Sequence, residues 1–204
     1  MMRAQPAQRA TGIWTVSEYT LDRGWLPQAR RVPSPNFELR PAGCVPELLV
    51  IHNISLPPGQ YGGDAIERFF CNGLDCDEHP FYEEIRGVEV SAHLLIRRSG
   101  ELVQFVSLEQ RAWHAGQSCY AGRENCNDFS IGIELEGTDD DPYTGAQYRA
   151  LATVTFELQR YYPAISDECI VGHSDIAPGR KTDPGPAFDW ARYRADLSAQ
   201  GEKA

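Results

Sequence analysis

Two histidines and an aspartate are the residues of this chain whose types and positions best suit metal chemistry. His52 follows an apolar run that begins at Leu48, and His173 and Asp183 come close together much later. Two imidazoles and one carboxylate leave one position of a tetrahedral zinc ion open for water or substrate, as catalytic sites do. A structural zinc site would be closed by four protein ligands. The set therefore predicts a catalytic zinc centre and a zinc hydrolase.

Other histidines leave alternatives open. A histidine at the end of a strand, taken alone, is more often a hydrogen-bonded core residue than a metal ligand. His93 lies in an apolar stretch, which favours a core or supporting role, whereas His114 follows Trp113 in a loop, which favours a substrate contact. The segment from 173 to 185 contains two prolines and two glycines. Such an elaborate turn has no evident packing purpose, which favours the ligand interpretation.

A zinc hydrolase also needs a group that accepts the proton of the attacking water. Glu134 and Glu136 lie in the apolar stretch 130–136 and face the same side, because side chains alternate along a strand. Burying a glutamate there is costly without a role, but a pair facing solvent is the alternative, and the residues alone do not choose between the two. Lys181 could place its ammonium beside a tetrahedral intermediate, or it could be a solvated loop lysine.

The elements that must position these residues alternate between strands and helices. Residues 48–54 are typical of a buried strand, and residues 130–136 of a half-buried one. Residues 144–162 carry the apolar stripe of a long helix. This alternation predicts an α/β fold with a mixed sheet flanked by helices. The remaining expectations are an irregular lead-in before 46, a short helix at 64–70, a polar loop at 71–87 that could line a cleft, hairpin strands at 90–97 and 101–107, a loop at 111–128, an extended piece at 167–172 and a helix at 188–197.

The composition is that of a soluble protein with one domain. The chain has 204 residues, 42% of them hydrophobic and 24% charged, which is enough for one substantial core. Its formal net charge of -10 argues against nucleic acid or an anionic membrane as the main partner. No apolar run is long enough for a signal core or a membrane span, so we expect a cytoplasmic protein whose six cysteines are free thiols.

Several long motifs resemble the type 2 N-acetylmuramoyl-L-alanine amidase family. The resemblance runs from about Gly24 to Arg194, and it supports a variable lead-in at 1–23, a single zinc amidase domain at 24–198 and a tail at 199–204. It implies the fold of peptidoglycan-recognition proteins and zinc amidases. The motifs stand at residues 31–36, 50–59, 111–116, 126–139 and 180–190.

The resemblance also implies roles for individual residues. It assigns zinc to His52, His173 and Asp183. It makes Glu134, the first glutamate of its stretch, the general base, and Lys181 the stabiliser of the transition state. The residues expected to contact the substrate lie in the same motifs and are Asn53, Trp113, His114, Ala115 and Asn127.

The implied reaction is hydrolysis of the amide between N-acetylmuramic acid, or its 1,6-anhydro form, and the L-alanine of a stem peptide. The expected partner is thus a small muropeptide, met in the cytoplasm during cell-wall recycling by a monomeric enzyme. Enterobacterial members of the family carry arginines where this chain has Glu89 and Asn125, so the preferred stem peptide is left open. The alternatives are a non-catalytic muropeptide sensor on the same fold and a zinc peptidase that cuts within the stem peptide.

Overall fold

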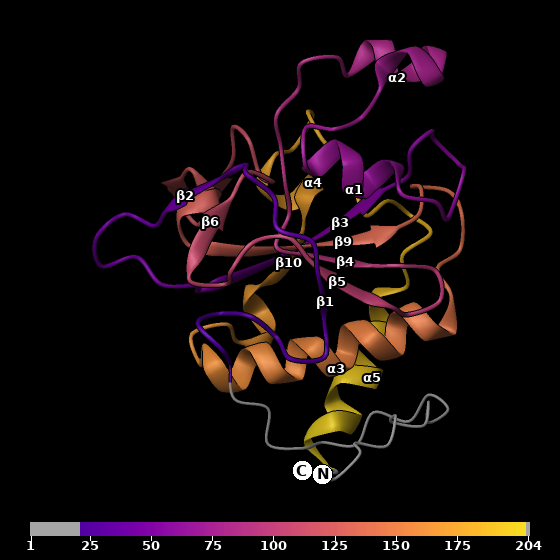
Figure 1. The fold of residues 1–204 in the computed structure, drawn as a ribbon. Helices are drawn as coiled ribbons and strands as arrows, with labels where there is room; N and C mark the ends of the chain where they lie inside the picture. Colours follow the sequence, from indigo (N-terminus) through magenta and orange to yellow (C-terminus); the bar gives the residue numbers. More distant parts are fainter. Residues whose placement is uncertain (1–20, 203–204) are drawn as a thin grey trace, which may run out of the picture.

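A mixed six-stranded sheet forms the centre of the molecule. The computed structural model describes residues 21–202 (Figure 1). Most of the predicted lead-in and part of the predicted tail lie outside these residues. The strands run in the order β1-β5-β4-β9-β3-β10, with β4 and β5 antiparallel and the other neighbours parallel. The mixed sheet was predicted, and it is confirmed. Its strands are β1 (Arg30–Arg31), β3 (Leu48–Ile54), β4 (Leu94–Ile96), β5 (Leu102–Gln104), β9 (Ser130–Glu136) and β10 (Ile170–Gly172).

The two central strands, β3 and β9, have faces of different composition. Side chains alternate along each strand, so odd-numbered and even-numbered residues point to opposite faces. All of the odd-numbered residues except Asn53 are apolar and fully or almost fully buried, among them Ile51 and Ile133, and these join one core cluster with residues of α3 and α5. On the opposite face, the carboxyl halves carry His52, Glu134 and Glu136, and the register sets His52 opposite Glu134. The sheet therefore has a packing face and a chemical face.

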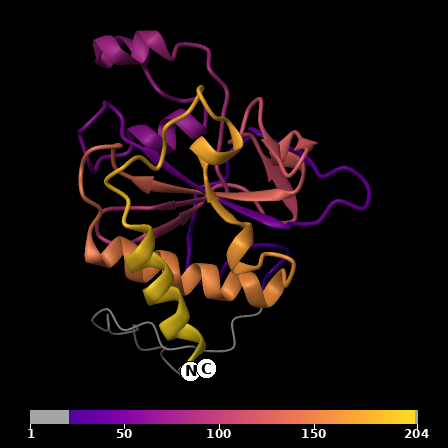
Figure 2. The ribbon, with the colours of Figure 1, turned by 180° about the vertical axis from the view of Figure 1, so that it is seen from behind.

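Helices α3 (Gly145–Tyr161) and α5 (Trp190–Gly201) cover the packing face, as both views of the ribbon show (Figures 1 and 2). Thr144 begins α3 with a capping box, in which its hydroxyl accepts from the Gln147 amide while the Gln147 side chain bonds back to the Thr144 amide. Leu151, which lies on the apolar stripe of α3, is completely buried. The predicted long helix at 144–162 is confirmed.

The opposite side of the sheet carries shorter elements, some of which the sequence did not reveal. The predicted loop at 71–87 contains the 3-10 helix η1 (Cys76–Glu78) and helix α2 (Pro80–Glu84), so that prediction is wrong. The His79 ring accepts from the Phe81 amide at 3.1 Å and caps α2. A helix this short shows too little periodicity to be recognised in a sequence. The other helices of this side are α1 (Ala65–Phe70) and α4 (His173–Ile176).

Other boundaries also differ from the expectations. The predicted hairpin is present, but β4 and β5 are shorter than the ranges expected for them. The segments expected to be irregular contain two small two-stranded sheets, β2 (Phe37–Leu39) with β6 (Gln110–Ala112) and β7 (Cys119–Tyr120) with β8 (Arg123–Glu124), and the 3-10 helix η2 (Cys126–Asp128). The piece expected to be extended at 167–172 begins instead with the 3-10 helix η3 (Asp167–Cys169), and only its second half is a strand, β10. Helix α5 ends three residues beyond 198, inside the predicted tail. Within residues 21–202, no helix combines the length and apolar character that a membrane span requires.

Candidate active site

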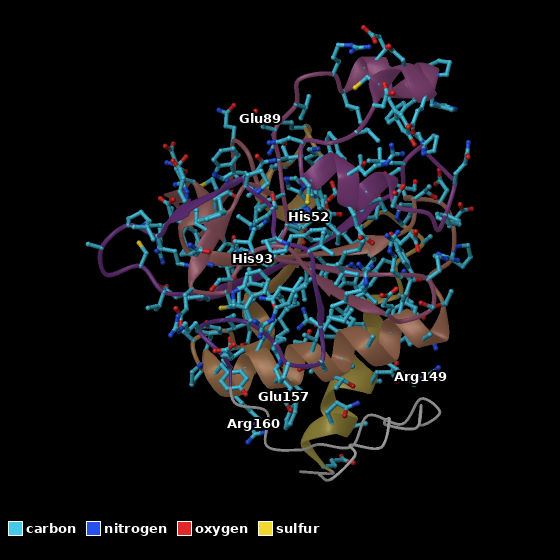
Figure 3. The ribbon with its side chains drawn as sticks, in the orientation of Figure 1. His52, Glu89, His93, Arg149, Glu157 and Arg160 are labelled. Atoms are coloured by element: carbon cyan, nitrogen blue, oxygen red, sulfur yellow. The ribbon has the colours of Figure 1, made fainter. Side chains whose placement is uncertain are left out.

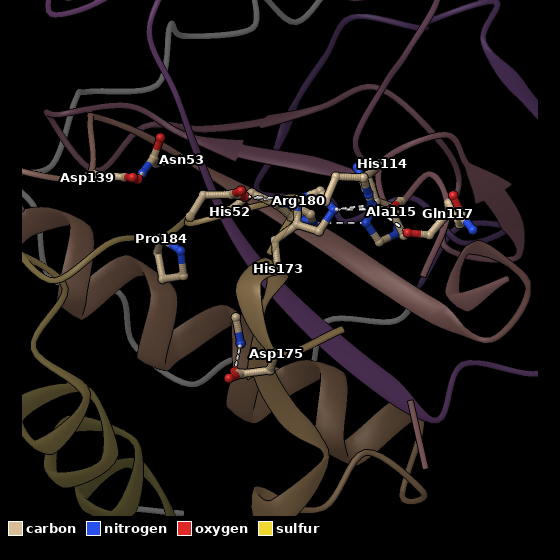
Figure 4. Close-up of polar contacts among 12 residues, drawn as sticks. His52, Asn53, His114, Ala115, Gln117, Asp139, His173, Asp175, Arg180 and Pro184 are labelled. Carbon is tan, nitrogen blue, oxygen red and sulfur yellow. Dashed lines mark hydrogen bonds and ion pairs between the residues drawn. The ribbon is translucent and has the colours of Figure 1, made fainter. Parts of the chain in front are cut away.

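The three predicted metal ligands meet at the carboxyl edge of the sheet. His52 lies near the end of β3, and His173 begins α4 directly after β10, the parallel neighbour of β3. Their Nδ1 atoms are 2.9 Å apart (Figure 4). The Asp183 Oδ2 atom lies 3.0 Å from His52 Nδ1 and 3.1 Å from His173 Nδ1. The topology therefore brings residues 121 and 131 positions apart into one cluster that could hold a metal ion.

The donor set of this cluster fits a cation. The His173 Nε2 atom lies 3.1 Å from the Ala115 carbonyl oxygen, which can only accept, so Nε2 carries the ring proton and Nδ1 presents a lone pair. A lone pair and a carboxylate oxygen repel each other at such a distance unless a proton or cation lies between them. Ligand atoms around a tetrahedral zinc with bonds of about 2.0 Å are about 3.3 Å apart, close to the separations here.

Burial and hydrogen bonds shift the pKa values of His52 and Asp183 in this cluster. Burial is the main reason why the pKa of His52 falls to about 4, which keeps its imidazole neutral. Burial alone would raise the pKa of Asp183, but hydrogen bonds with His173 and His52 outweigh it and hold that pKa well below its ordinary value. A neutral imidazole at His52 and an ionised carboxylate at Asp183 are the protonation states that metal binding requires of these two residues.

Glu134 lies beside this cluster and is unusual among the buried polar groups. It is only 9% exposed, and its Oε2 atom has no hydrogen-bond partner within residues 21–202. Burial, followed by the negative charge of Asp183, raises its pKa well above the ordinary value, while Lys181 opposes the rise. A carboxyl group with a raised pKa and a free oxygen beside a metal centre can both accept and donate a proton.

Glu136, two residues further along β9, is fully engaged with the protein. Its Oε1 atom accepts from the Gly62 amide at 2.7 Å and from the Arg97 guanidinium at 3.0 Å. Its Oε2 atom accepts from the Arg98 amide at 2.9 Å. The residues alone left the two glutamates equivalent, whereas their hydrogen bonds give Glu136 a structural role and leave Glu134 available for chemistry.

A cleft of about 630 Å³ opens over the cluster. Lys181, whose side chain is exposed, lines it together with the three clustered residues and Glu134. Another part of the cleft lining is apolar and comes from α1, α2 and the segment after α2. A polar loop had been predicted at 71–87, so the apolar character of this wall was not expected. Its main residues are Phe69, Phe70, Phe81, Ile85, Val88 and Val90.

The predicted substrate contacts divide into two groups. Asn53, Trp113 and His114 line the cleft, and Asn53 donates to the Asp139 carboxylate at 2.8 Å (Figure 4). Ala115 and Asn127 lie behind the cluster and are not part of the cleft lining. The Asn127 Oδ1 atom accepts from the backbone amides of His114 and Ala115, at 3.1 and 2.8 Å. For all five residues, a contact with substrate stays a prediction.

Three further residues lie in or near the cleft. Arg180 lines the cleft and donates to the carbonyls of Ala115 and Gln117 at 2.7 and 2.6 Å. No role was predicted for it from the sequence. Glu89 is exposed and lies above the sheet, outside the cleft lining (Figure 3). Asn125 is also exposed and borders an adjoining pocket, which it shares with Arg180.

Comparisons with known proteins show the family to which the chain belongs. Residues 42–186 match the family model described as N-acetylmuramoyl-L-alanine amidase. The 1,6-anhydro-N-acetylmuramyl-L-alanine amidase AmpD of Salmonella typhimurium (strain SL1344) is 60% identical over 182 residues, which are 89% of this chain and 97% of that protein. The AmpD of Escherichia coli (strain K12) is 59% identical over 180 residues, which are 88% of this chain and 98% of that protein.

Solved structures extend the comparison. A crystal structure of a selenomethionine derivative of AmpD matches with a TM-score of 0.85 and 59% identity, covering 87% of this chain and 99% of that chain. AmpDh3 from Pseudomonas aeruginosa, in complex with anhydromuramic pentapeptide, matches with a TM-score of 0.55 and 31% identity, covering 76% of this chain and 61% of that chain. The family model matches most of the chain and the relatives are about 60% identical to it, so this chain belongs to the N-acetylmuramoyl-L-alanine amidase family.

Proposed function

We propose that this amidase uses zinc to hydrolyse the amide bond between (1,6-anhydro-)N-acetylmuramic acid and the L-alanine of a muropeptide. The observation that carries the proposal is the cluster of His52, His173 and Asp183, with the unpaired Glu134 carboxyl beside it in an open cleft. Relatives of about 60% identity named as 1,6-anhydro-N-acetylmuramyl-L-alanine amidases support the choice of bond.

A zinc ion held by His52, His173 and Asp183 would supply Lewis-acid chemistry, polarising the lactyl carbonyl and activating a water molecule. Glu134 accepts the proton of the attacking water and then donates a proton to the alanine amine as the amide bond breaks. Its raised pKa suits both halves of this cycle. Lys181 provides an ammonium on the cleft that stabilises the negative charge developing on the carbonyl oxygen.

The lining of the cleft suits a substrate that has one apolar side and one polar side. The phenylalanines of the apolar wall give a surface against which a sugar ring can pack. Arg180 and Lys181 line the same cleft and offer positive charge to the carboxylates of a stem peptide. AmpDh3, a relative of 31% identity, is seen in complex with anhydromuramic pentapeptide, which supports a ligand of this class.

We propose further that the enzyme works as a cytoplasmic monomer in cell-wall recycling. The three clustered residues, Glu134 and Lys181 line one cleft of one chain, which supports a monomeric enzyme. All six cysteines are free thiols, as is usual in a reducing compartment. Light scattering on the purified protein tests the oligomeric state, and cell fractionation tests the compartment.

The activity is tested with anhydromuramyl-tripeptide, followed by mass spectrometry. Zinc-loaded protein should release anhydro-N-acetylmuramic acid and free tripeptide, and a chelated sample and Glu134→Ala should release neither. Substrate that binds but stays intact would instead support the non-catalytic sensor. Peptides cut beyond the L-alanine would support a zinc peptidase.

A further inference from the structure

We propose that Ser130 and His114 form a relay that determines which nitrogen of His52 carries its proton, so that Nδ1 is free for the metal. Both would then be positioning residues of the metal centre. The inference rests on the proposed function, since it concerns the same metal cluster. It assigns His114 a role at the metal centre rather than, or in addition to, the substrate contact predicted from the sequence.

The relay follows from the hydrogen bonds behind His52. The Ser130 hydroxyl donates to the Cys126 carbonyl at 2.6 Å, so its oxygen can only accept from His114 Nε2, which lies 3.1 Å away. With its proton on Nε2, the neutral ring of His114 has a lone pair on Nδ1. That atom lies 2.9 Å from His52 Nε2 and accepts from it. His52 therefore holds its proton on Nε2 and presents a bare Nδ1 to His173 and Asp183.

Strand β9 has a glycine, Gly132, at the position where the His114 ring packs against it. A Cβ atom at Gly132 would lie 2.5 Å from both Cγ and Nδ1 of His114, which is shorter than any tolerated contact. Only glycine at this position lets the His114 ring lie against β9, within reach of His52. Two residues of β9 on this face therefore serve the relay. Ser130 accepts the hydrogen bond from His114, and Gly132 leaves space for the His114 ring.

A second set of contacts determines in the same way which nitrogen of His173 carries its proton. Ala115, the residue after His114, offers its carbonyl oxygen to His173 Nε2 at 3.1 Å. The side chain of Asn127 accepts from the backbone amides of both His114 and Ala115. One short loop, held by one asparagine, therefore orients both imidazoles of the cluster. Hydrogen bonds of this kind fix the tautomer and ring orientation of metal-bound histidines, and their loss weakens metal binding by about 10- to 100-fold.

The test compares His114→Asn with His114→Leu in the full chain. The two new side chains have the same branched shape, but only asparagine keeps an acceptor where His114 Nδ1 lay. The readout is the zinc dissociation constant, measured by competition with a chromophoric chelator. We expect His114→Leu and Ser130→Ala to weaken zinc binding by about 10- to 100-fold, and His114→Asn to recover most of that loss. Thr155→Val, which removes a buried hydroxyl bonded to Tyr193 on the other side of the sheet, is the control and should bind zinc like the unaltered protein.

A second measurement uses the unaltered protein and therefore does not depend on whether a variant folds. The ¹⁵N chemical shifts of the imidazoles in the unaltered, metal-free protein report which nitrogen carries each proton. We expect a protonated Nε2 for His52, His114 and His173. A bare Nε2 on His52, or zinc binding by His114→Leu that equals that of the unaltered protein, would overturn the relay. Unaltered protein that binds no zinc would instead refute the metal centre and the proposed function with it.

Discussion

Along β9, the residues that face α3 and those on the opposite face of the strand are both buried, but burial has opposite consequences for them. Ile131, Ile133 and Leu135 contact other apolar side chains, and burying such side chains stabilises the fold by about 1.5 to 3 kcal/mol each. On the other face, Glu134 and Glu136 are buried carboxylates, which cost free energy unless they are paired. Within residues 21–202, Glu136 accepts three hydrogen bonds, whereas the Oε2 atom of Glu134 has no partner. The contrast suggests that stability comes from one face of the strand and reactivity from one residue of the other.

Replacement of Glu134 should separate reactivity from stability most strongly. We expect Glu134→Gln to lower kcat by about 10²- to 10⁴-fold, because the proton acceptor is lost while the shape is kept. The free energy of unfolding should not fall, since an unpaired buried carboxyl is removed. Kinetics on a muropeptide and urea unfolding of the same sample check both. A variant with near-normal kcat would mean that another group takes the proton.

Glu136 should respond in the opposite way. Glu136→Gln leaves the buried Arg97 guanidinium, whose side chain is 7% exposed, without its charge partner on β9. Because Arg97 keeps its ion pair with Glu67, the loss of unfolding free energy should lie at the lower end of the ~3 to 5 kcal/mol typical of broken buried pairs. The kcat of the molecules that remain folded should fall far less than in Glu134→Gln. Urea unfolding measures the first effect, and a large loss of kcat in folded protein would contradict the division of roles.

The packing face offers a reference for stability alone. Leu151→Ala in α3 removes a completely buried side chain from the cluster beneath β9. Substitutions of this kind cost about 3 kcal/mol of unfolding free energy. The zinc dissociation constant and the kcat of folded protein should stay unchanged. A change in either would show that the two faces are coupled through the strand.

The smallest expected effect concerns the ion pairs at the end of the sheet. Hydrogen bonds from Arg30, and less strongly from Arg97, lower the pKa of Glu67 below its ordinary value of 4.5, even though burial opposes the shift. A lowered pKa stabilises the folded state above pH 4.5, and the contribution is lost as the pH falls through the folded-state pKa. Glu67→Gln should therefore be about 1 kcal/mol less stable than the unaltered protein at pH 7. The difference should shrink below pH 4.5, and a gap that is constant with pH would refute the assignment.

The sequence predicted the strands and helices that carry strong periodicity, and much less of the rest. The apolar runs of β3 and β9 and the stripe of α3 identified these elements, because burial acts on each of them directly. Helix α2, which borders the apolar wall of the cleft, was missed because a five-residue helix shows hardly more than one period. The clustering of His52, His173 and Asp183 was anticipated, but only the parallel pairing of β3 with β10 explains it.

Some roles depend on hydrogen bonds that no sequence pattern encodes. Glu134 and Glu136 occupy equivalent positions in the alternation, and the difference between them comes from amides and a guanidinium of distant segments. Asn127 was expected to contact the substrate, yet its side chain is committed to two backbone amides behind the cluster. Such assignments require the register of the sheet and the course of the loops.

The parallel pairing of β3 with β9 and β10 has a consequence for the order of events during folding. Strands so far apart in sequence pair only after long loops have closed, and such contacts form slowly. The cluster is complete only when Asp183, near the end of the described chain, has joined the first histidine. A nascent chain should therefore expose no finished metal site, and zinc would act at the last step by trapping the folded state. Zinc added to unfolded protein should consequently slow unfolding once the chain has folded, rather than accelerate folding.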